Sequence, residues 1–363
     1  PRRGVGDAEG RDLSRLSSSE ESGSDEEDSV VDELARRPRS KHKPARRRRR
    51  ARTGRDECMF NGTLCKYDCV RAGARLRRWR IVDTNNGSHP DEEDRCNIYW
   101  IDVANIYDRM QRLRPWQRIN HFPGMTNIAR KARMAQNLEK MRRLFPSEYN
   151  FYPKTWVLPT EFGDFKTHFD SHGKSRQIFI IKPDSGCQGR GIFLTSSLDQ
   201  VDLQESQVAQ QYIRRPLLIE EYKFDLRIYV LMTSCKPLRI YLFRDGLVRL
   251  ATQEYVKPSK ANINDRCMHL TNYAVNKTND NFQKADQAMG ESGSKRSLAW
   301  FMRWIAETRG DKKAKIVWQR ISQLCCKTLL AVVPTLVREY ENHFERHLQR
   351  RKGHAVPSPP PAA

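Results

Sequence analysis

The chain has 363 residues and a formal net charge of +22 at pH 7, so it is long enough for one large domain or two modest ones with ample core. The large positive field indicates an acidic partner: nucleic acid, an anionic membrane or an acidic protein surface. No run of about 18 apolar residues occurs, so no membrane span is expected. The first residues lack the apolar segment of a signal peptide and lack an initiating methionine, so a fragment is one expectation.

The two ends of the chain and its cysteines suggest no folded or metal-binding element. Residues 1–54 are expected to form a disordered charged tail, acidic and serine-rich at Ser17–Asp28 and then basic at Arg46–Arg50. The arginine run suits a nuclear signal, an RNA contact or an electrostatic tether, or it is a solvated polybasic tail. Residues 349–363 form a basic and proline-rich tail. The nine cysteines show no zinc spacing and are expected to be reduced thiols.

Order is predicted to begin near Cys58. Leu64–Val70 indicates a short strand leading into a helix, and Asn97–Val103 indicates a strand with aromatic residues. Between them, Asn85–Asp94 is predicted to be a polar turn. Another turn is expected at His121–Gly124, because proline and glycine interrupt regular structure there.

A helix is predicted over Asn127–Phe145, with Thr126 as its N-terminal cap. Apolar residues recur at helical spacing on one side, and this stripe is expected in the core. The opposite face is basic, and it is either solvated or a docking surface for an acidic polymer. The apolar set is Ile128, Met134, Leu138, Met141 and Phe145, and the basic set is Arg130, Lys131, Arg133, Lys140, Arg142 and Arg143.

Several β-rich runs then follow one another with short turns between them. This pattern favours a mixed or antiparallel sheet over regular alternation of strand and helix, and with the flanking helices it gives an α/β (α+β) class. An extended segment at Phe151–Pro159 precedes the runs. Helices are predicted at Ser297–Glu307 and Lys313–Arg351, the second broken or kinked at Pro334. The predicted strands are Gln207–Ile213, Leu217–Glu220, Phe224–Ser234, Leu238–Phe243 and Leu247–Thr252.

The chain is organised around Gln177–Phe193, a predicted strand, glycine-rich loop and second strand. The first strand ends at Lys182-Pro183, and the loop Asp184–Gly191 holds three glycines. Glycines let backbone N–H groups approach an anion, and Lys182 can place a charge on a phosphate, so a nucleoside triphosphate is the simplest ligand. Taken alone, such a loop is more often a plain hairpin turn, and it matches neither the P-loop nor the dinucleotide fingerprint.

Charged and polar residues follow this loop. Lys223, Asp225 and Arg227 alternate onto one strand face, where they form a site or an exposed row of ion pairs, because buried unpaired charges are costly. Arg249 lies in an apolar run and needs an anion: a carboxylate, a phosphate or an acidic side chain. Met268–Tyr273 offers hydroxyl and amide groups suited to a phosphate or small substrate, or else forms a capped turn.

Several long motifs, in this order, resemble the tubulin–tyrosine-ligase-like family and are closest to its tubulin polyglutamylases. They are KPDSGCQGRGIF, QQYI, KFDLRIYVLMTSCKPLRIYLFRDGLVRLAT and CMHLTNYAVNK, with INHFPGM (Ile119–Met125) and FYPKTW (Phe151–Trp156) upstream. The similarity extends from about Cys58 to Phe344. It implies an ATP-grasp fold and the ligation of amino acids to protein carboxylates, with residues 55–175 as the N-terminal and linking part and residues 176–348 as the ATP-grasp core.

The resemblance also implies a role for each matching residue. Lys182 contacts ATP phosphate, Arg227 stabilises phosphate or acyl-phosphate charge, and these two are the implied catalytic residues. The loop residues Gln188 and Gly189 lie over the phosphates and the acceptor. The implied glutamate-binding residues are Gln188, Arg249, Tyr273 and Lys295, and the remaining ATP-binding residues are Gln210, Gln211, Tyr212, Ile213, Lys223, Asp225, Thr271 and Asn272.

The implied activity is ATP-dependent tubulin polyglutamylation. A γ-carboxylate in a tubulin tail attacks ATP to give an acyl phosphate, and the amine of free L-glutamate then displaces phosphate. The implied cofactors are ATP and Mg²⁺, and the implied partner is the acidic tubulin tail of microtubules. The implied location is the cytoplasm and cytoskeleton, with the cilium and basal body. Nucleic acid ranks last as a partner, because no RNA-recognition signature accompanies the arginine run.

One part of the family pattern is not matched. The family's C-terminal stretch ends in a Glu-Val-Asn motif that supplies Mg²⁺ ligands, whereas this sequence continues from Phe344 into HLQRRKGHAVPSPPPAA. No metal ligand is therefore assigned, and the core is expected to lack its metal-binding end. The alternative to the ligase is a catalytically inactive form that binds microtubules or another acidic protein.

Overall fold

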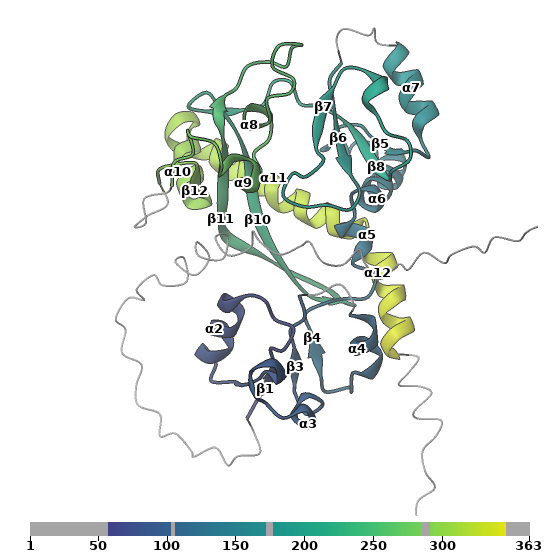
Figure 1. Ribbon diagram of the computed structural model, residues 1–363, viewed down its shortest axis with the longest axis vertical. Coiled ribbons are helices and arrows are strands. Elements are labelled where there is room, and N and C mark those ends of the chain that lie inside the picture. The colour runs from purple at the N-terminus through teal and green to yellow at the C-terminus, as the bar shows by residue number, and fades with distance from the viewer. Residues whose placement is uncertain (1–56, 103–105, 172–176, 285–290, 346–363) are drawn as a thin grey trace, which may run out of the picture. The chain divides into compact units, whose positions relative to one another are not determined.

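The computed structural model describes residues 57–102, 106–171, 177–284 and 291–345. The tails expected at 1–54 and 349–363 lie outside these ranges, as do the last residues of the helix predicted to end at Arg351. The described chain divides into two compact units, one up to Asn120 and one from His121 (Figure 1). The division into 55–175 and 176–348 stays a prediction.

The first unit is built on a parallel sheet with strand order β2-β1-β3-β4. Its core lies around Val82, Tyr99 and Ile101. The strand predicted at Asn97–Val103 is present but short, and the polar turn predicted at Asn85–Asp94 is wrong in part. A helix starts there because Pro90 occupies its first turn with three acidic residues. The elements are β1 Met59–Asn61, α2 Asp68–Leu76, β2 Arg80–Val82, the 3₁₀ turn η2 Thr84–Asn86, α3 Pro90–Glu93, β3 Ile98–Tyr99, α4 Tyr107–Arg112 and β4 Arg118–Ile119.

The second unit contains an antiparallel sheet with strand order β5-β8-β6-β7. Successive side chains alternate between its faces, so Trp156 packs with helix α7 while Val157 packs against helix α6. Both faces of the sheet are therefore buried. The elements are α6 Lys131–Leu144, β5 Thr155–Leu158, α7 Phe162–Ser171, β6 Phe179–Pro183, β7 Phe193–Thr195 and β8 Gln207–Gln211, with the 3₁₀ turn η3 Leu198–Gln200 between β7 and β8.

A second antiparallel sheet in this unit has strand order β12-β11-β10-β9. Two of its strands, β10 and β11, are much longer than their neighbours and continue as a ribbon (Figure 1). Phe224 and Leu226 of β10 pack with Phe301 of α10, so α10 covers one face. The elements are β9 Leu218–Ile219, β10 Tyr222–Cys235, β11 Leu238–Glu254, α8 Arg266–His269, α9 Tyr273–Asn276, β12 Lys295–Ser297, α10 Leu298–Arg309, α11 Asp311–Leu330, α12 Val333–Tyr340 and the π-helical turn η4 Glu341–Glu345.

The helix predicted over Asn127–Phe145 is divided in two. A short helix α5, Thr126–Ala129, ends where Arg130 adopts an extended conformation, and α6 begins at the next residue. Thr126 is not the cap, since Met125 holds that position without a side-chain hydrogen bond. The predicted apolar stripe is right at Leu138, which is buried, and wrong at Phe145, which is half exposed.

Other predicted elements are confirmed with changed bounds. The predicted strands at Leu238–Phe243 and Leu247–Thr252 are a single strand, β11. The predicted break at Pro334 is confirmed, because α11 ends at Leu330 and the next helix is bent from it by 47°. All nine cysteines are free thiols, as expected. Within the described ranges no single helix is long and apolar enough to span a membrane, although α11 and Val333–Phe344 pass that test together as a bent pair.

Candidate functional site

The glycine-rich loop joins β6 to β7, as the sequence predicts. The two strands pair antiparallel, with Phe179 opposite Thr195. Gly189 has a φ of +81°, and a Cβ atom there would lie 2.9 Å from Cγ2 of Val275 and 3.2 Å from Cγ of Asn272. Only glycine permits both this left-handed conformation and this close approach. The loop is therefore packed directly against the start of α9.

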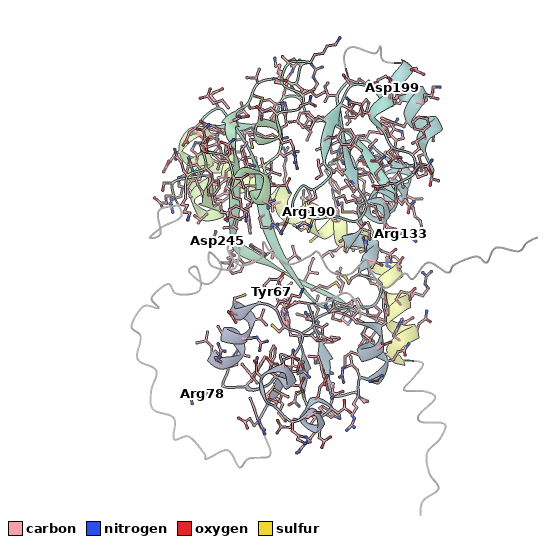
Figure 2. The ribbon with its side chains drawn as sticks, in the orientation of Figure 1. Tyr67, Arg78, Arg133, Arg190, Asp199 and Asp245 are labelled. Carbon is pink, nitrogen blue, oxygen red and sulfur yellow. The ribbon has the colours of Figure 1, made fainter. Side chains whose placement is uncertain are left out.

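Cations hold the carbonyl groups of this loop on two sides. Lys131 Nζ donates hydrogen bonds to the carbonyl oxygens of Pro183 (2.8 Å) and Gly186 (2.9 Å), and Arg266 Nη2 donates to that of Gly189 (2.8 Å). Lys131 is thus bound to this loop, and the two alternatives given for its helix face, solvation or docking of an acidic polymer, stay predictions. By contrast, Arg190 (labelled in Figure 2) is exposed on the loop and donates to Gln188 Oε1 at 3.3 Å.

The amine of Lys182 projects from the end of β6 and is held by a neutral acceptor. Its Nζ donates to Gln210 Oε1 at 2.8 Å. Burial, followed by repulsion from Lys131, lowers the pKa of Lys182 from 10.5 to about 8. An anionic ligand that approached this amine would therefore meet a charge that no carboxylate among its described contacts neutralises.

A second buried amine, that of Lys223, lies close enough to Lys182 for their charges to repel. Lys223 Nζ donates to the Tyr212 hydroxyl at 2.8 Å and to the His269 carbonyl at 2.7 Å. Burial, then repulsion from Lys182, lowers the pKa of Lys223 to about 8, against an opposing effect of Asp225. The two lysines thus form a pair of poorly solvated cations beside the glycine-rich loop.

His269 is buried at this position, and no role for it is predicted from the sequence. Its Nε2 lies 3.0 Å from the Asn262 carbonyl, and its Nδ1 lies 3.3 Å from the Tyr212 hydroxyl. Burial lowers the pKa of this imidazole, so it is neutral at pH 7 and supports Tyr212 without adding charge. A lone histidine in an apolar run carries no signal in the sequence that distinguishes this role from ordinary core packing.

The next residue on this face of β10, Asp225, binds two partners. Its carboxylate accepts two hydrogen bonds from Arg249, at 2.8 Å each, and one from the Thr271 hydroxyl at 2.7 Å. The ion pair follows from the register, because Asp225 and Arg249 are directly opposite in β10 and β11. The anion that Arg249 needs is thus the Asp225 carboxylate, and its glutamate-binding role stays a prediction.

Lys295 continues this charged row. It is opposite Arg249 across β11 and β12, is only 8% exposed, and its Nζ lies 3.4 Å from the ring centroid of Tyr273. The face of the Tyr273 ring stabilises the ammonium by a cation–π interaction. Arg227 lies two residues beyond Asp225 and is exposed at the surface. Of the three charged residues predicted to share this strand face, Lys223 and Asp225 are therefore hydrogen-bonded within the site, whereas Arg227 is solvent-accessible.

The segment Gln210–Ile213, expected to hold adenine, has much of its backbone engaged in the sheet. β8 pairs with both β5 and β6, the N–H of Gln211 donates to the Lys154 carbonyl, and that of Tyr212 to the Ile178 carbonyl. The side chain of Gln210 contacts Lys182, that of Tyr212 is buried, and that of Ile213 is 56% exposed. An adenine contact in this segment stays a prediction.

These residues suit a nucleotide polyphosphate better than a metal ion. The two poorly solvated amines and the glycine loop offer positive charge and hydrogen-bond donors, which is the chemistry that phosphate oxygens require. In the described part of the chain no group of three histidine, cysteine, aspartate or glutamate side chains is placed to hold a metal. The residues present therefore assign no metal ligand.

Comparisons with known proteins agree with this chemistry. Residues 109–347 match the model of the tubulin-tyrosine ligase family. The chain is 42% identical over 303 residues to tubulin polyglutamylase TTLL13 of Mus musculus, covering 83% of this chain and 35% of the relative. It is also 42% identical to tubulin polyglutamylase ttll6 of Danio rerio, covering 79% of this chain and 35% of the relative.

A third relative is similar to the same extent. The probable beta-tubulin polyglutamylase of Tetrahymena thermophila is 42% identical over 286 residues, covering 78% of this chain and 23% of the relative. This chain thus spans at most about a third of the length of these curated relatives, which have further sequence that it does not match.

Proposed function

The chain belongs to the tubulin-tyrosine ligase family, and from this premise we propose that it is an ATP-dependent ligase that joins glutamate to tubulin. Its fold is the ATP-grasp fold of that family, with mixed and antiparallel sheets and flanking helices. The relatives are named tubulin polyglutamylases, which supports tubulin as the protein substrate. The acceptor in this proposal is a glutamate γ-carboxylate in an acidic tubulin tail.

The pair of Lys182 and Lys223 carries the proposal. Both amines have pKa values lowered to about 8 and are bound to neutral oxygens. The electrostatic free energy of binding a polyphosphate is therefore more favourable at these poorly solvated amines than at exposed lysines. In ligation by ATP, the transferred phosphoryl group and the acyl phosphate both carry charge that cations stabilise. We assign Lys182 and Lys223 to the phosphates and the exposed Arg227 to the developing acyl phosphate.

The remaining residues bind and orient the reactants in this proposal. The Gly189 region of the loop is fixed by Arg266 and covers the phosphates, while Thr271, bound to Asp225, lies at the edge of the nucleotide. Lys295 presents positive charge to a carboxylate of incoming L-glutamate, with Tyr273 beneath Lys295. Arg249, whose guanidinium is paired with Asp225, is assigned to the same glutamate from the family resemblance. Mg²⁺ would neutralise phosphate charge when bound, and none of these assignments depends on its ligands.

The net charge of +22 supports an acidic polypeptide as the partner. A positive field raises the rate of encounter with acidic tubulin tails, and the effect weakens as salt screens it. A tubulin substrate places the protein at the cytoskeleton, and we extend this proposal to the cilium and basal body.

The test is mass spectrometry of tubulin tails after incubation of microtubules with the chain, MgATP and glutamate. Lys182→Ala removes the proposed phosphate contact, and Lys166→Ala, on the exposed face of α7, is the matched control. We expect added glutamate with the control variant and none with Lys182→Ala, both variants being folded by circular dichroism. Addition that persists in Lys182→Ala would contradict the assigned role.

The alternative function gives a different result in the same experiment. The alternative is supported if neither the Lys166→Ala control nor Lys182→Ala adds glutamate, but the chain sediments with microtubules and dissociates from them as the salt concentration rises. The chain is then a binding module for acidic tails. The +22 charge is the observation that favours this alternative. Pelleting that does not depend on salt, or no pelleting, would exclude it.

A further inference from the structure

We propose that Gln210 and Thr155 are positioning residues for Lys182, and that they fix its ammonium through one directed chain of hydrogen bonds. Lys182 Nζ donates to Gln210 Oε1 at 2.8 Å, Gln210 Nε2 donates to Thr155 Oγ1 at 2.8 Å, and Thr155 Oγ1 donates to the Pro153 carbonyl at 2.9 Å. The consequence for ligation rests on the proposed function, in which Lys182 binds phosphate.

The sheet places the three side chains side by side. Thr155 and Gln210 are directly opposite in β5 and β8, and Gln210 is also opposite Ile180 in β6. Lys182 follows Ile180 by two residues and therefore projects from the same face, next to Gln210. The arrangement thus depends on the register of three strands, which no local sequence pattern reveals.

The donor-to-acceptor direction of this series of hydrogen bonds is fixed at both of its ends. The Pro153 carbonyl can only accept, so the Thr155 hydroxyl donates to it and is left to accept from the Gln210 amide nitrogen. The amide oxygen of Gln210 is then turned toward Lys182. If the amide were reversed, its NH₂ group would face an ammonium, which is also a donor.

A neutral acceptor suits an amine that must also bind an anion. An ammonium has three N–H groups, and the described contacts of Lys182 use one of them. A carboxylate at this position would neutralise the charge and compete with phosphate, whereas an amide orients the amine and leaves its charge available. The acceptor matters more here because burial and Lys131 already favour loss of the proton.

The test compares Thr155→Val with Thr155→Ser in the full chain. Valine keeps the branched shape but removes the hydroxyl, while serine keeps the hydroxyl. Trace labelling of amines with an acid anhydride across a pH series, read by mass spectrometry, gives the pKa of Lys182 without any nucleotide. We expect Thr155→Val to lower that pKa by up to about one unit, a tenfold loss of proton affinity, and Thr155→Ser to restore it.

Nucleotide affinity is measured on the same variants with ATP. We expect Thr155→Val to weaken binding about tenfold, and more so as the pH rises. An unchanged Lys182 pKa in folded Thr155→Val would overturn the proposal. If the pKa shifts but ATP neither binds nor protects Lys182 from labelling, the hydrogen-bond chain stands and the proposed nucleotide function fails.

Gln210→Glu is the second variant and makes the test independent of the folding of Thr155→Val. It keeps the size of the side chain and adds a negative charge next to Lys182. We expect the Lys182 pKa to rise while the affinity for ATP falls about tenfold. A merely structural role of Gln210 would not raise the pKa and lower the affinity together. A Gln210→Glu protein with the original Lys182 pKa would equally overturn the proposal.

Discussion

Replacing Gly189 by alanine tests whether the glycine-rich loop must lie where the structure places it. The left-handed φ of +81° costs an alanine about 1–2 kcal/mol. The added methyl group would lie 2.9 Å from Val275 Cγ2, and such overpacking typically costs a further 1–3 kcal/mol or so. The present loop conformation is thus destabilised by roughly 2–5 kcal/mol, which an exposed loop relieves by moving away from α9 rather than by unfolding the domain.

We expect Gly189→Ala to weaken ATP binding by at least about 30-fold, because about 2 kcal/mol of loop displacement opposes each binding event. The free energy of unfolding in urea should fall by much less. Titration calorimetry with ATP measures the first quantity, and Gly163→Ala is the control, since a Cβ at that position in α7 meets nothing within 4 Å. Wild-type ATP affinity in Gly189→Ala would refute the assignment of this loop to the phosphates.

Two further predictions concern the charged residues. Because Lys182 and Lys223 have pKa values lowered to about 8, they lose protons above that pH, so we expect ATP affinity to fall as pH rises through 8. For the same reason the unfolded chain binds more protons between about pH 8 and pH 10.5, and the free energy of unfolding should rise over that interval. A flat unfolding profile would contradict the burial of these amines, and a flat ATP-affinity profile would contradict their assignment to the phosphates. Asp225→Asn and Arg249→Met, combined in a double-mutant cycle in urea, should give a coupling free energy of about 1–3 kcal/mol, reduced from a fully buried pair because the Asp225 side chain is 37% exposed. A coupling near zero would mean that the pair does not form in solution.

The strands around the site could be predicted because local signals determine them. The β-branched run before Lys182 and the glycines after it specify a strand and a loop with no help from the rest of the chain. The alternation of Lys223, Asp225 and Phe224 likewise predicts which side chains share a face, and the structure places Phe224 with α10 and the two charged residues opposite.

What the sequence could not reveal depends on partners far along the chain. The Arg-Asp-Gly before Leu247 resembles a turn, yet the strand continues. Gly246 is needed there because a Cβ atom would collide with the carbonyl oxygen of Arg227 in β10. The start of α6 is also set from a distance, since the Asp184 carboxylate accepts the N–H of Ala132, 52 residues away. No propensity at Arg130 predicts this break.

The long ribbon of β10 and β11 has a consequence for which changes in chain length the protein can accept. Its pairing shifts register at three places, between Tyr222 and Phe224, Ile228 and Val230, and Met232 and Ser234. Asp225 and Arg249 lie between the first two shifts, and their ion pair forms only because side chains alternate regularly between the two faces of each strand. One inserted residue there would turn one of the two side chains to the opposite face. Toward the turn at Lys236-Pro237, where extra residues already bulge from the ladder, an insertion can be absorbed by another bulge. Variation in length is therefore expected to accumulate at the far end of the ribbon and to be excluded from its base.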